Sequence, residues 1–184
     1  MRNPFNYFKN EMIKFRKPIV LVLMGLFVAL AVVLTRLTNW YIMPTQRVNF
    51  AFLATSIGSL ILGPFLGALN AAVADIVGYF LFPSGGAFFP GFTITALVGG
   101  TLYGLFLYKK PITILRVAVA VLCVSLIGDL FLNSIWLSIL FKAAWLPLLV
   151  GRILKTVLWY PVQVFVIYYV WKLAVDKIRY LKEV

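Results

Sequence analysis

Long apolar runs, separated by short polar or Gly/Pro breaks, restrict the fold of this chain more than any other feature. Hydrophobic residues make up 63% of its 184 residues, and the mean hydropathy is +1.01. Soluble domains contain roughly 45 to 50% apolar residues, so a bilayer must be the solvent around this chain. We therefore predict an all-α integral membrane protein that forms a single membrane domain over residues 1–184.

Six membrane-spanning helices are predicted from the apolar runs and from the residues that interrupt them. About 20 apolar residues cross a bilayer, and fewer suffice where it thins locally. Gly63 and Pro64 force a tight turn, and the stretch from Pro83 to Gly91 cannot be helical throughout. The predicted spans are 19–38, 48–62, 65–82, 92–108, 115–141 and 149–173.

A short helix ahead of the first span is predicted to lie on the cytoplasmic membrane surface. Apolar residues recur there at helical spacing, with charged residues between them. These apolar residues are Phe5, Phe8, Met12 and Phe15. The helix either anchors the chain or binds a partner.

The distribution of the 17 basic residues predicts the orientation in the membrane. Cytoplasmic loops carry an excess of Lys and Arg, and six spans place twelve basic residues together with both termini on one side. They are Arg2, Lys9, Lys14, Arg16, Lys17, Lys109, Lys110, Arg116, Lys172, Lys177, Arg179 and Lys182. Anchoring to anionic headgroups of the lipid bilayer explains this positive charge, so we predict no nucleic-acid partner.

Five basic residues fall near predicted outer helix ends, against the cytoplasmic bias. They are Arg36, Arg47, Lys142, Arg152 and Lys155. Arg152 and Lys155 are three residues apart and share one helix face. Because guanidinium groups bind carboxylates bidentately, the set predicts a ligand that bears one or more carboxylates. For each residue alone, snorkelling to lipid headgroups is the alternative.

Asp75 and Asp129 lie near the middles of predicted spans, where an ionisable side chain is costly and marks a candidate site. Helical spacing places Asp129, Asn133 and Trp136 on one face. A carboxylate, an amide and an aromatic plate suit a planar, nitrogen-rich ring, since a carboxylate accepts a bidentate pair from adjacent N–H groups. Hydrogen bonding between helices is the alternative.

The stretch from Pro83 to Gly91 mixes backbone breakers with aromatic residues. Non-helical backbone at membrane depth is tolerated where it lines a cavity. Gly85 and Gly86 allow close approach of backbone to a ligand, and Phe88 and Phe89 offer rings that stack on a flat ligand. An extracellular hairpin loop is the alternative.

The residues that are absent or rare restrict the chemistry. The chain has no histidine, five acidic residues and one cysteine, and no phosphate-binding Walker loop. We therefore predict no metal site, no cofactor and no enzymatic activity, and ATP hydrolysis by that route must belong to a partner. A small membrane enzyme using Asp75 and Asp129 with a metal stays as a rival.

Two stretches resemble the substrate-binding S components of energy-coupling factor (ECF) transporters, specifically the folate-specific members. The first runs from Gly63 to Tyr108 and contains GPFLGALNAAVADIVGYFLFPSGGAFFPGF. The second is LNSIWL at 132–137, followed by Arg152, Lys155 and Pro161. Together they extend over most of the chain.

The resemblance implies a six-helix subunit that binds folate with high affinity at the outer face of a prokaryotic plasma membrane. Such subunits work with a membrane scaffold subunit and two ATPases. The family's scaffold contact resembles an Ala-x-x-x-Ala pattern on the first helix, where this chain has Gly25 and Ala29. S components for riboflavin, thiamin or biotin share the architecture and stay as alternatives.

Folate has the parts that the residues predict. Its pterin ring suits Asp75 and Asn133 as hydrogen-bonding groups, and its aromatic system suits Phe88, Phe89 and Trp136 for stacking or gating. The glutamate tail suits four cations, which are Arg36, Arg47, Arg152 and Lys155.

Overall fold

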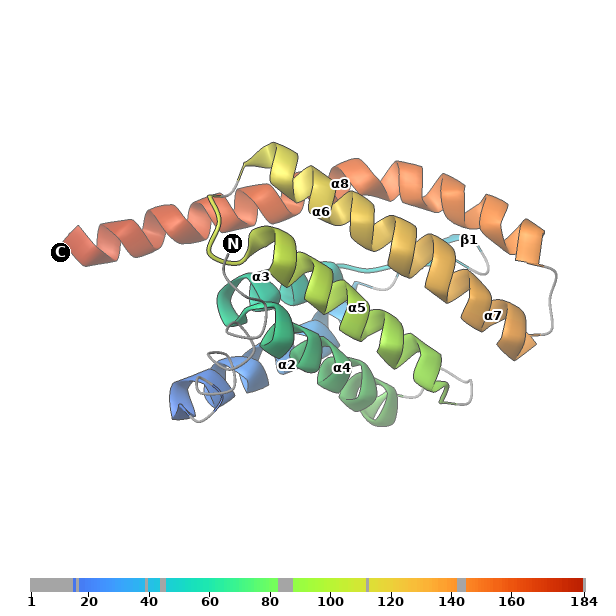
Figure 1. The fold of residues 1–184 in the computed structure, drawn as a ribbon, viewed down its shortest axis with the longest axis horizontal. Helices are drawn as coiled ribbons and strands as arrows, with labels where there is room; N and C mark the ends of the chain where they lie inside the picture. The colour runs from blue at the N-terminus through green and yellow to red at the C-terminus, as the bar shows by residue number, and fades with distance from the viewer. Residues whose placement is uncertain are drawn as a thin grey trace, which may run out of the picture.

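A bundle of helices with one small hairpin forms the chain, as the computed structural model in Figure 1 shows. The structure describes residues 15, 17–38, 40–43, 46–82, 88–111, 113–141 and 145–183. Its elements are α2 (Pro18–Leu37), β1 (Trp40–Met43), β2 (Gln46–Val48), α3 (Ala51–Leu62), α4 (Pro64–Leu81), α5 (Pro90–Leu107), α6 (Ile114–Val124), η1 (Ser125–Leu132), α7 (Asn133–Phe141) and α8 (Trp145–Glu183). The segment η1 is a π-helix that joins α6 to α7 in one continuous rod.

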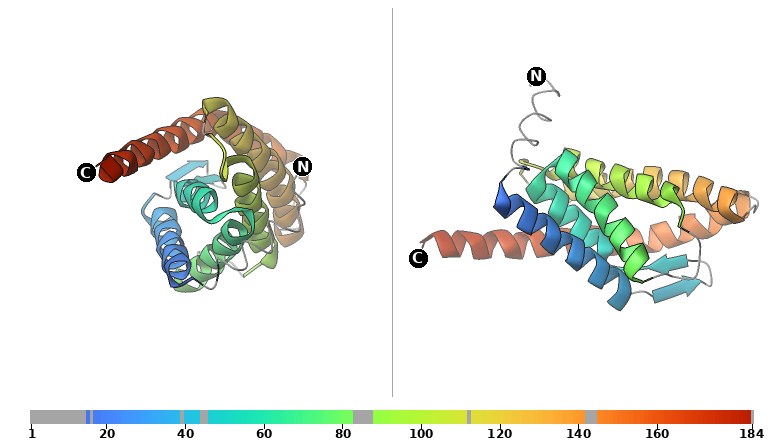
Figure 2. Two further views of the ribbon diagram at one scale, coloured as in Figure 1. Left: turned by 60° about the vertical axis from the view of Figure 1, so that its left-hand side comes forward. Right: turned by 90° about the horizontal axis from the view of Figure 1, so that it is seen from below.

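Successive rods of the bundle run antiparallel. Near one end of the α4–α5 pair, Gly104 lies against Pro64, and towards the other end Thr93 contacts Asp75. We call the first of these the turn end, since α3 and α4 meet there at Gly63. The other is the hairpin end, where β1, β2, α7 and the start of α5 lie (Figures 1 and 2). As a result, α2 begins and α8 ends on the turn-end side.

Gly63 adopts a positive φ of 106°, which glycine tolerates and other residues rarely adopt. Pro64 follows at the first position of α4, where a missing N–H costs nothing. The predicted Gly–Pro turn between the second and third helices is therefore confirmed.

Small residues allow α3, α4 and α5 to pack closely. A Cβ on Gly67 would lie 2.5 Å from Oγ of Ser59, and a Cβ on Gly100 would lie 2.6 Å from the carbonyl oxygen of Gly67. A Cβ on Gly104 would overlap the backbone of Pro64. Such small-residue contacts are typical of helices that associate in membranes by close van der Waals packing.

Gly104→Ala should lower the thermal stability of the purified protein. The backbone of Pro64 cannot move aside as a flexible side chain could, so overpacking should cost about 1 to 3 kcal/mol. Gly25→Ala is the matched control, because a Cβ on Gly25 meets no described atom within 4 Å. Equal melting temperatures for the two variants in detergent would contradict this packing.

A buried apolar cluster connects the helices in the turn-end half of the bundle. It unites side chains from α3, α5, α6 and α8, which are Leu60, Tyr103, Leu107, Val117, Ala120, Val121, Val164 and Ile167. Burial of this apolar surface against neighbouring helices ties α8 to the rest of the bundle.

The prediction of an all-α chain with several membrane-length helices is confirmed. Five stretches among the described residues are long and apolar enough to cross a bilayer, which are Pro18–Thr35, Pro64–Leu81, Pro90–Leu107, Ile114–Leu140 and Leu149–Leu173. Helix α3 has 12 residues, or about 18 Å, against roughly 30 Å of hydrocarbon. Six crossings therefore stay a prediction that requires α3 to cross where the bilayer is thin.

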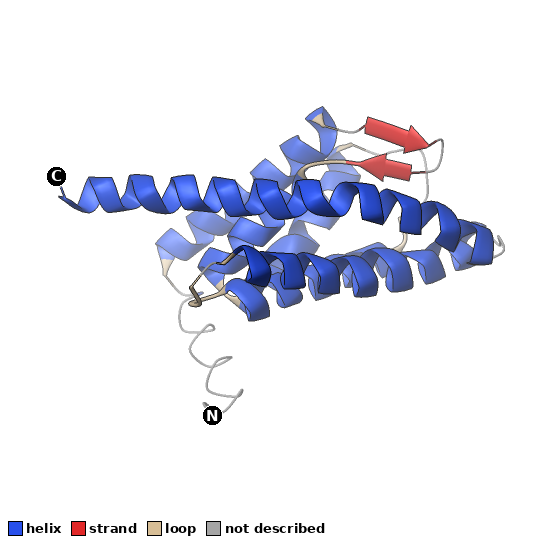
Figure 3. Ribbon diagram, turned by 90° about the horizontal axis from the view of Figure 1, so that it is seen from above, coloured by secondary structure: helices blue, strands red, loops and turns tan. Residues whose placement is uncertain are grey.

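The hairpin is an element that the sequence pattern did not predict. Residues 46–48 form β2, so the predicted second span begins three residues later than expected, at Ala51. Strand β1 pairs antiparallel with β2, and Figure 3 shows the pair beside the helices. The Phe50 ring lies 5.5 Å from the Trp159 ring of α8, and the Phe50 N–H donates to Oγ1 of Thr38. These contacts connect the residues just after the hairpin to the end of α2 and to α8.

Helix α8 is longer than the predicted span 149–173. It contains 39 residues with Pro161 inside, or about 58 Å of helix, and its C-terminal part extends past the bundle (Figure 1). The predicted surface helix lies outside the described residues, except for Phe15.

Candidate ligand-binding site

Polar side chains from four rods line up towards the hairpin end of the bundle. They come from α4, the first turns of α5, the rod η1–α7 and the start of α8. We call them the polar row, which consists of Asp75, Thr93, Thr95, Asp129, Asn133, Trp136 and Arg152. Polar groups within a membrane protein are costly unless they are paired, and each member of the row has a partner.

Asp75 of α4 pairs with the start of α5. Its Oδ2 accepts a hydrogen bond from Oγ1 of Thr93 at 2.7 Å, and both side chains are half-buried. A carboxylate can accept more hydrogen bonds than this one. Asp75 therefore keeps acceptor capacity for a ligand.

Trp136 of α7 is fixed on the first turns of α5. Its Nε1 donates to Oγ1 of Thr95 at 3.1 Å, and that hydroxyl donates to the carbonyl oxygen of Gly91 at 3.2 Å. The indole lies above Gly91, where a Cβ would come within 2.6 Å of it. Its centroid is 5.8 Å from the Phe89 ring. Trp136 thus supplies a plate whose orientation is set by α5.

Asp129, Asn133 and Arg152 form the third part of the polar row. Nδ2 of Asn133 donates to Oδ1 of Asp129 at 3.2 Å, and Nη1 of Arg152 donates to the backbone carbonyl of Asp129 at 2.7 Å. Arg152 is only 8% exposed. The predicted stripe of Asp129, Asn133 and Trp136 therefore lies on one rod, with Asp129 and Asn133 in direct contact.

Phe88 and Phe89 turn to different neighbours. The Phe88 ring lies 5.2 Å from Tyr79 and 5.9 Å from Phe80, at the end of α4, whereas Phe89 faces Trp136. Rings at these separations attract one another by offset or edge contacts. Phe88 therefore packs on the end of α4, and Phe89 packs on α7.

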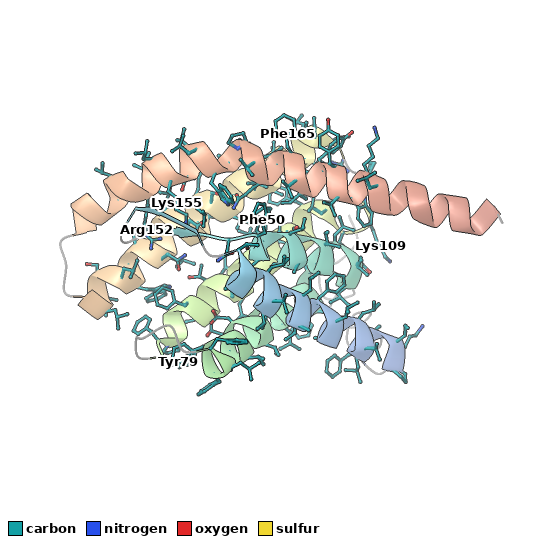
Figure 4. All side chains as sticks on the ribbon, turned by 180° about the vertical axis from the view of Figure 1, so that it is seen from behind. Phe50, Tyr79, Lys109, Arg152, Lys155 and Phe165 are labelled. Carbon is teal, nitrogen blue, oxygen red and sulfur yellow. The ribbon has the colours of Figure 1, made fainter. Side chains whose placement is uncertain are left out.

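The predicted cations are described only in part. Lys155 is half-buried near Arg152 on α8, and Figure 4 shows both towards the same end of the molecule as Tyr79, with Lys109 towards the other end. The backbones of Arg36 and Arg47 belong to α2 and β2, but their side chains lie outside the described part, as do Gly85 and Gly86.

Gly25 and Ala29 lie on a face of α2 that other described helices do not cover. Both residues are exposed, and so are the neighbouring Leu26 and Leu30. This face is therefore open to lipid or to another subunit.

Sequence reasoning missed Gly91, Thr93 and Thr95 as parts of the site. Threonine is common in membrane helices, where its hydroxyl often bonds to its own backbone, as Thr101 does with the Leu97 carbonyl. The available signal was their position, because Gly91 ends the Pro83 to Gly91 stretch and the two threonines follow it on the first turns of α5.

The fold and the polar row define a class of protein. This is a multi-pass membrane bundle that is packed with apolar side chains at one end and carries polar and aromatic side chains at the other.

The chain belongs to the family of ECF transporter substrate-specific components, whose family model matches residues 20–175. It is 35% identical to the folate transporter FolT of Clostridium novyi (strain NT) over 169 residues, which cover 92% of this chain and 96% of that protein. The folate transporter FolT of Leuconostoc mesenteroides is 36% identical over 154 residues, covering 80% and 82% of the two chains.

A solved structure resembles this chain closely. The crystal structure of FolT bound with folic acid superposes with a TM-score of 0.78 at 37% identity, covering 84% of this chain and 93% of that one. The resemblance to folate-specific ECF components, suggested by the sequence motifs, is therefore confirmed. These relatives are transporters, not enzymes.

Proposed function

We propose that this chain binds folate with high affinity at the outer face of the cell membrane, as the S component of an ECF uptake transporter. The observation that carries the proposal is the similarity to the FolT structure that holds folic acid, which extends over 93% of that chain. The polar row supports it, since it combines hydrogen-bond acceptors with aromatic rings. The excess of basic residues in the termini and in the segment between α5 and α6 supports an outer location for the hairpin end.

The pterin ring meets its hydrogen-bonding partners on two sides of the site. Its adjacent ring and amino N–H groups are donors, which a carboxylate accepts as a pair. Asp129 with Asn133 and Asp75 with Thr93 supply the acceptors. Asp129 is the better held of the two carboxylates, because a second residue also holds its backbone. Preorganised groups lose less freedom on binding.

Aromatic rings and cations complete the site. Trp136, Phe88 and Phe89 stack on the flat part of folate or close over it, while Gly85 and Gly86 allow backbone to approach the ligand. Lys155, Arg36 and Arg47 are cations for the glutamate carboxylates. Arg152, the fourth predicted cation, donates to the Asp129 carbonyl within the polar row.

Transport requires partners, because the sequence contains no Walker loop for ATP hydrolysis. We place the scaffold subunit on the exposed Gly25–Ala29 face of α2, where small side chains let another helix approach closely. Two ATPases then act through the scaffold. The distribution of basic residues along the chain supports a cytoplasmic location for both termini, in a bacterial cell membrane.

Tryptophan fluorescence tests the proposal directly. The chain has five tryptophans, and folate should quench the emission saturably on titration into the purified protein. Riboflavin, thiamin and biotin should leave the emission unchanged at the same concentrations. A flat response to folate, or a tighter response to another vitamin, would refute the assignment.

A further inference from the structure

The π-helix η1 changes the hydrogen-bonding of the backbone beside the polar row. The Asn133 N–H bonds to the carbonyl of Gly128, five residues earlier. In an α-helix the same N–H would bond to the carbonyl of Asp129. In this wider turn the Asp129 carbonyl loses the Asn133 N–H as its hydrogen-bond donor. Segments of π-helix often occur at functional sites.

Arg152 supplies a partner for this carbonyl from a different helix. Its Nη1 lies 2.7 Å from the Asp129 oxygen, and only 8% of the residue is exposed. A hydrogen bond from a charged donor is stronger than one between neutral groups. The guanidinium therefore connects α8 to η1 at Asp129. The carboxylate of this same residue accepts a hydrogen bond from Asn133.

Asp129 is thus held from two sides, its backbone by Arg152 and its carboxylate by Asn133. Asn133 also has an acceptor of its own, the side-chain oxygen Oδ1. This atom is buried and has no hydrogen-bond partner in the described chain. An unpaired buried acceptor costs free energy. A donor on the ligand would pair with it.

We infer that Arg152 is a positioning residue: it fixes η1 so that Asp129 and Asn133 present acceptors to the ring of the ligand. The glutamate carboxylates then belong to other cations, with Lys155 nearest on α8. This revises the tail role that the sequence predicted for Arg152. The identity of the ring as a pterin rests on the proposed function.

Ligands with and without the glutamate tail distinguish positioning from direct contact. Arg152→Gln should weaken binding of folate and of pteroic acid, which keeps the pterin but lacks the glutamate, by the same factor of about tenfold or more. Arg152→Lys should restore part of the affinity for both, since an ammonium also donates to a carbonyl. Lys172→Gln, exposed on the same helix, is the matched control for loss of charge and should bind both ligands normally.

Direct contact of Arg152 with the glutamate tail predicts a different pattern. The Nε of Arg152 has no partner in the described chain and could make that contact. Arg152→Gln would then weaken folate binding far more than pteroic acid binding. That pattern overturns the inference, as does unchanged binding of both ligands. Arg152→Lys provides the same comparison if Arg152→Gln does not fold.

Hydrogen exchange without ligand separates this inference from the proposed function. Arg152→Gln should speed amide exchange across residues 125–136 relative to wild type and Lys172→Gln, since η1 loses its contact with α8. Unchanged exchange overturns the positioning role whether or not folate binds. Failure of wild-type protein to bind folate, with faster exchange in the variant, refutes only the proposed function.

Discussion

Asp129→Asn should weaken folate binding about 100-fold. The substitution keeps the shape of the side chain but turns a carboxylate into an amide, so that one of the acceptors we propose for the pterin N–H groups becomes a donor. Loss of a charge-assisted pair is worth about 2 to 3 kcal/mol, and each 1.4 kcal/mol is tenfold in affinity. Fluorescence titration of the purified variant measures the effect.

Two matched substitutions show whether the effect belongs to this carboxylate. Asp75→Asn should cause a smaller loss, because Asp75 is held by one described side chain rather than by contacts on both sides. Asp176→Asn, beyond the last apolar stretch of α8, should bind folate as wild type does. Equal affinity of Asp129→Asn and wild type would remove Asp129 from the site.

Trp136→Ala should abolish measurable folate binding and destabilise the protein. The indole contacts the Phe89 ring, covers Gly91 and donates to Thr95. Its removal leaves a gap between α5 and α7, and truncation of this half-buried side chain should cost less than the roughly 3 to 5 kcal/mol of a fully buried Trp. A lower melting temperature and a flat folate titration are the expected results.

Trp136→Phe separates the ring from its N–H group. It keeps a smaller aromatic plate above Gly91 and loses the hydrogen bond to Thr95, which is worth about 1 kcal/mol. We therefore expect Trp136→Phe to retain folate binding with a modest loss of affinity, detected through the remaining tryptophans. A binding loss as large as that of Trp136→Ala would contradict the view that an aromatic ring at this position is sufficient for binding.

The locations of the polar residues were more predictable than their partners. Periodicity placed Asp129, Asn133 and Trp136 on one face, and the structure places them on one rod. The bond from Arg152 to the Asp129 carbonyl was not predictable, because helical periodicity assumes α geometry and η1 departs from it. The pairing of Asp75 with Thr93 depends on the register between α4 and α5, which small residues at their contact allow.

The hairpin shows a similar limit at the level of secondary structure. Val48 adjoins an apolar run and is included in the predicted second span. Pairing with Trp40 makes Val48 part of strand β2 instead, since strand formation depends on the partner strand as much as on the residues themselves.

The solvent, the helical class and the uneven distribution of charge along the chain follow from the amino-acid sequence alone. Hydropathy and charge are local properties that add along the chain, and the Gly63–Pro64 turn is equally local. Which polar groups contact one another depends on the tertiary structure, because those hydrogen bonds join residues 18, 23 and 41 positions apart in the chain. Helix packing and the π-helical register of η1 set these distances, and neither is encoded in a single segment.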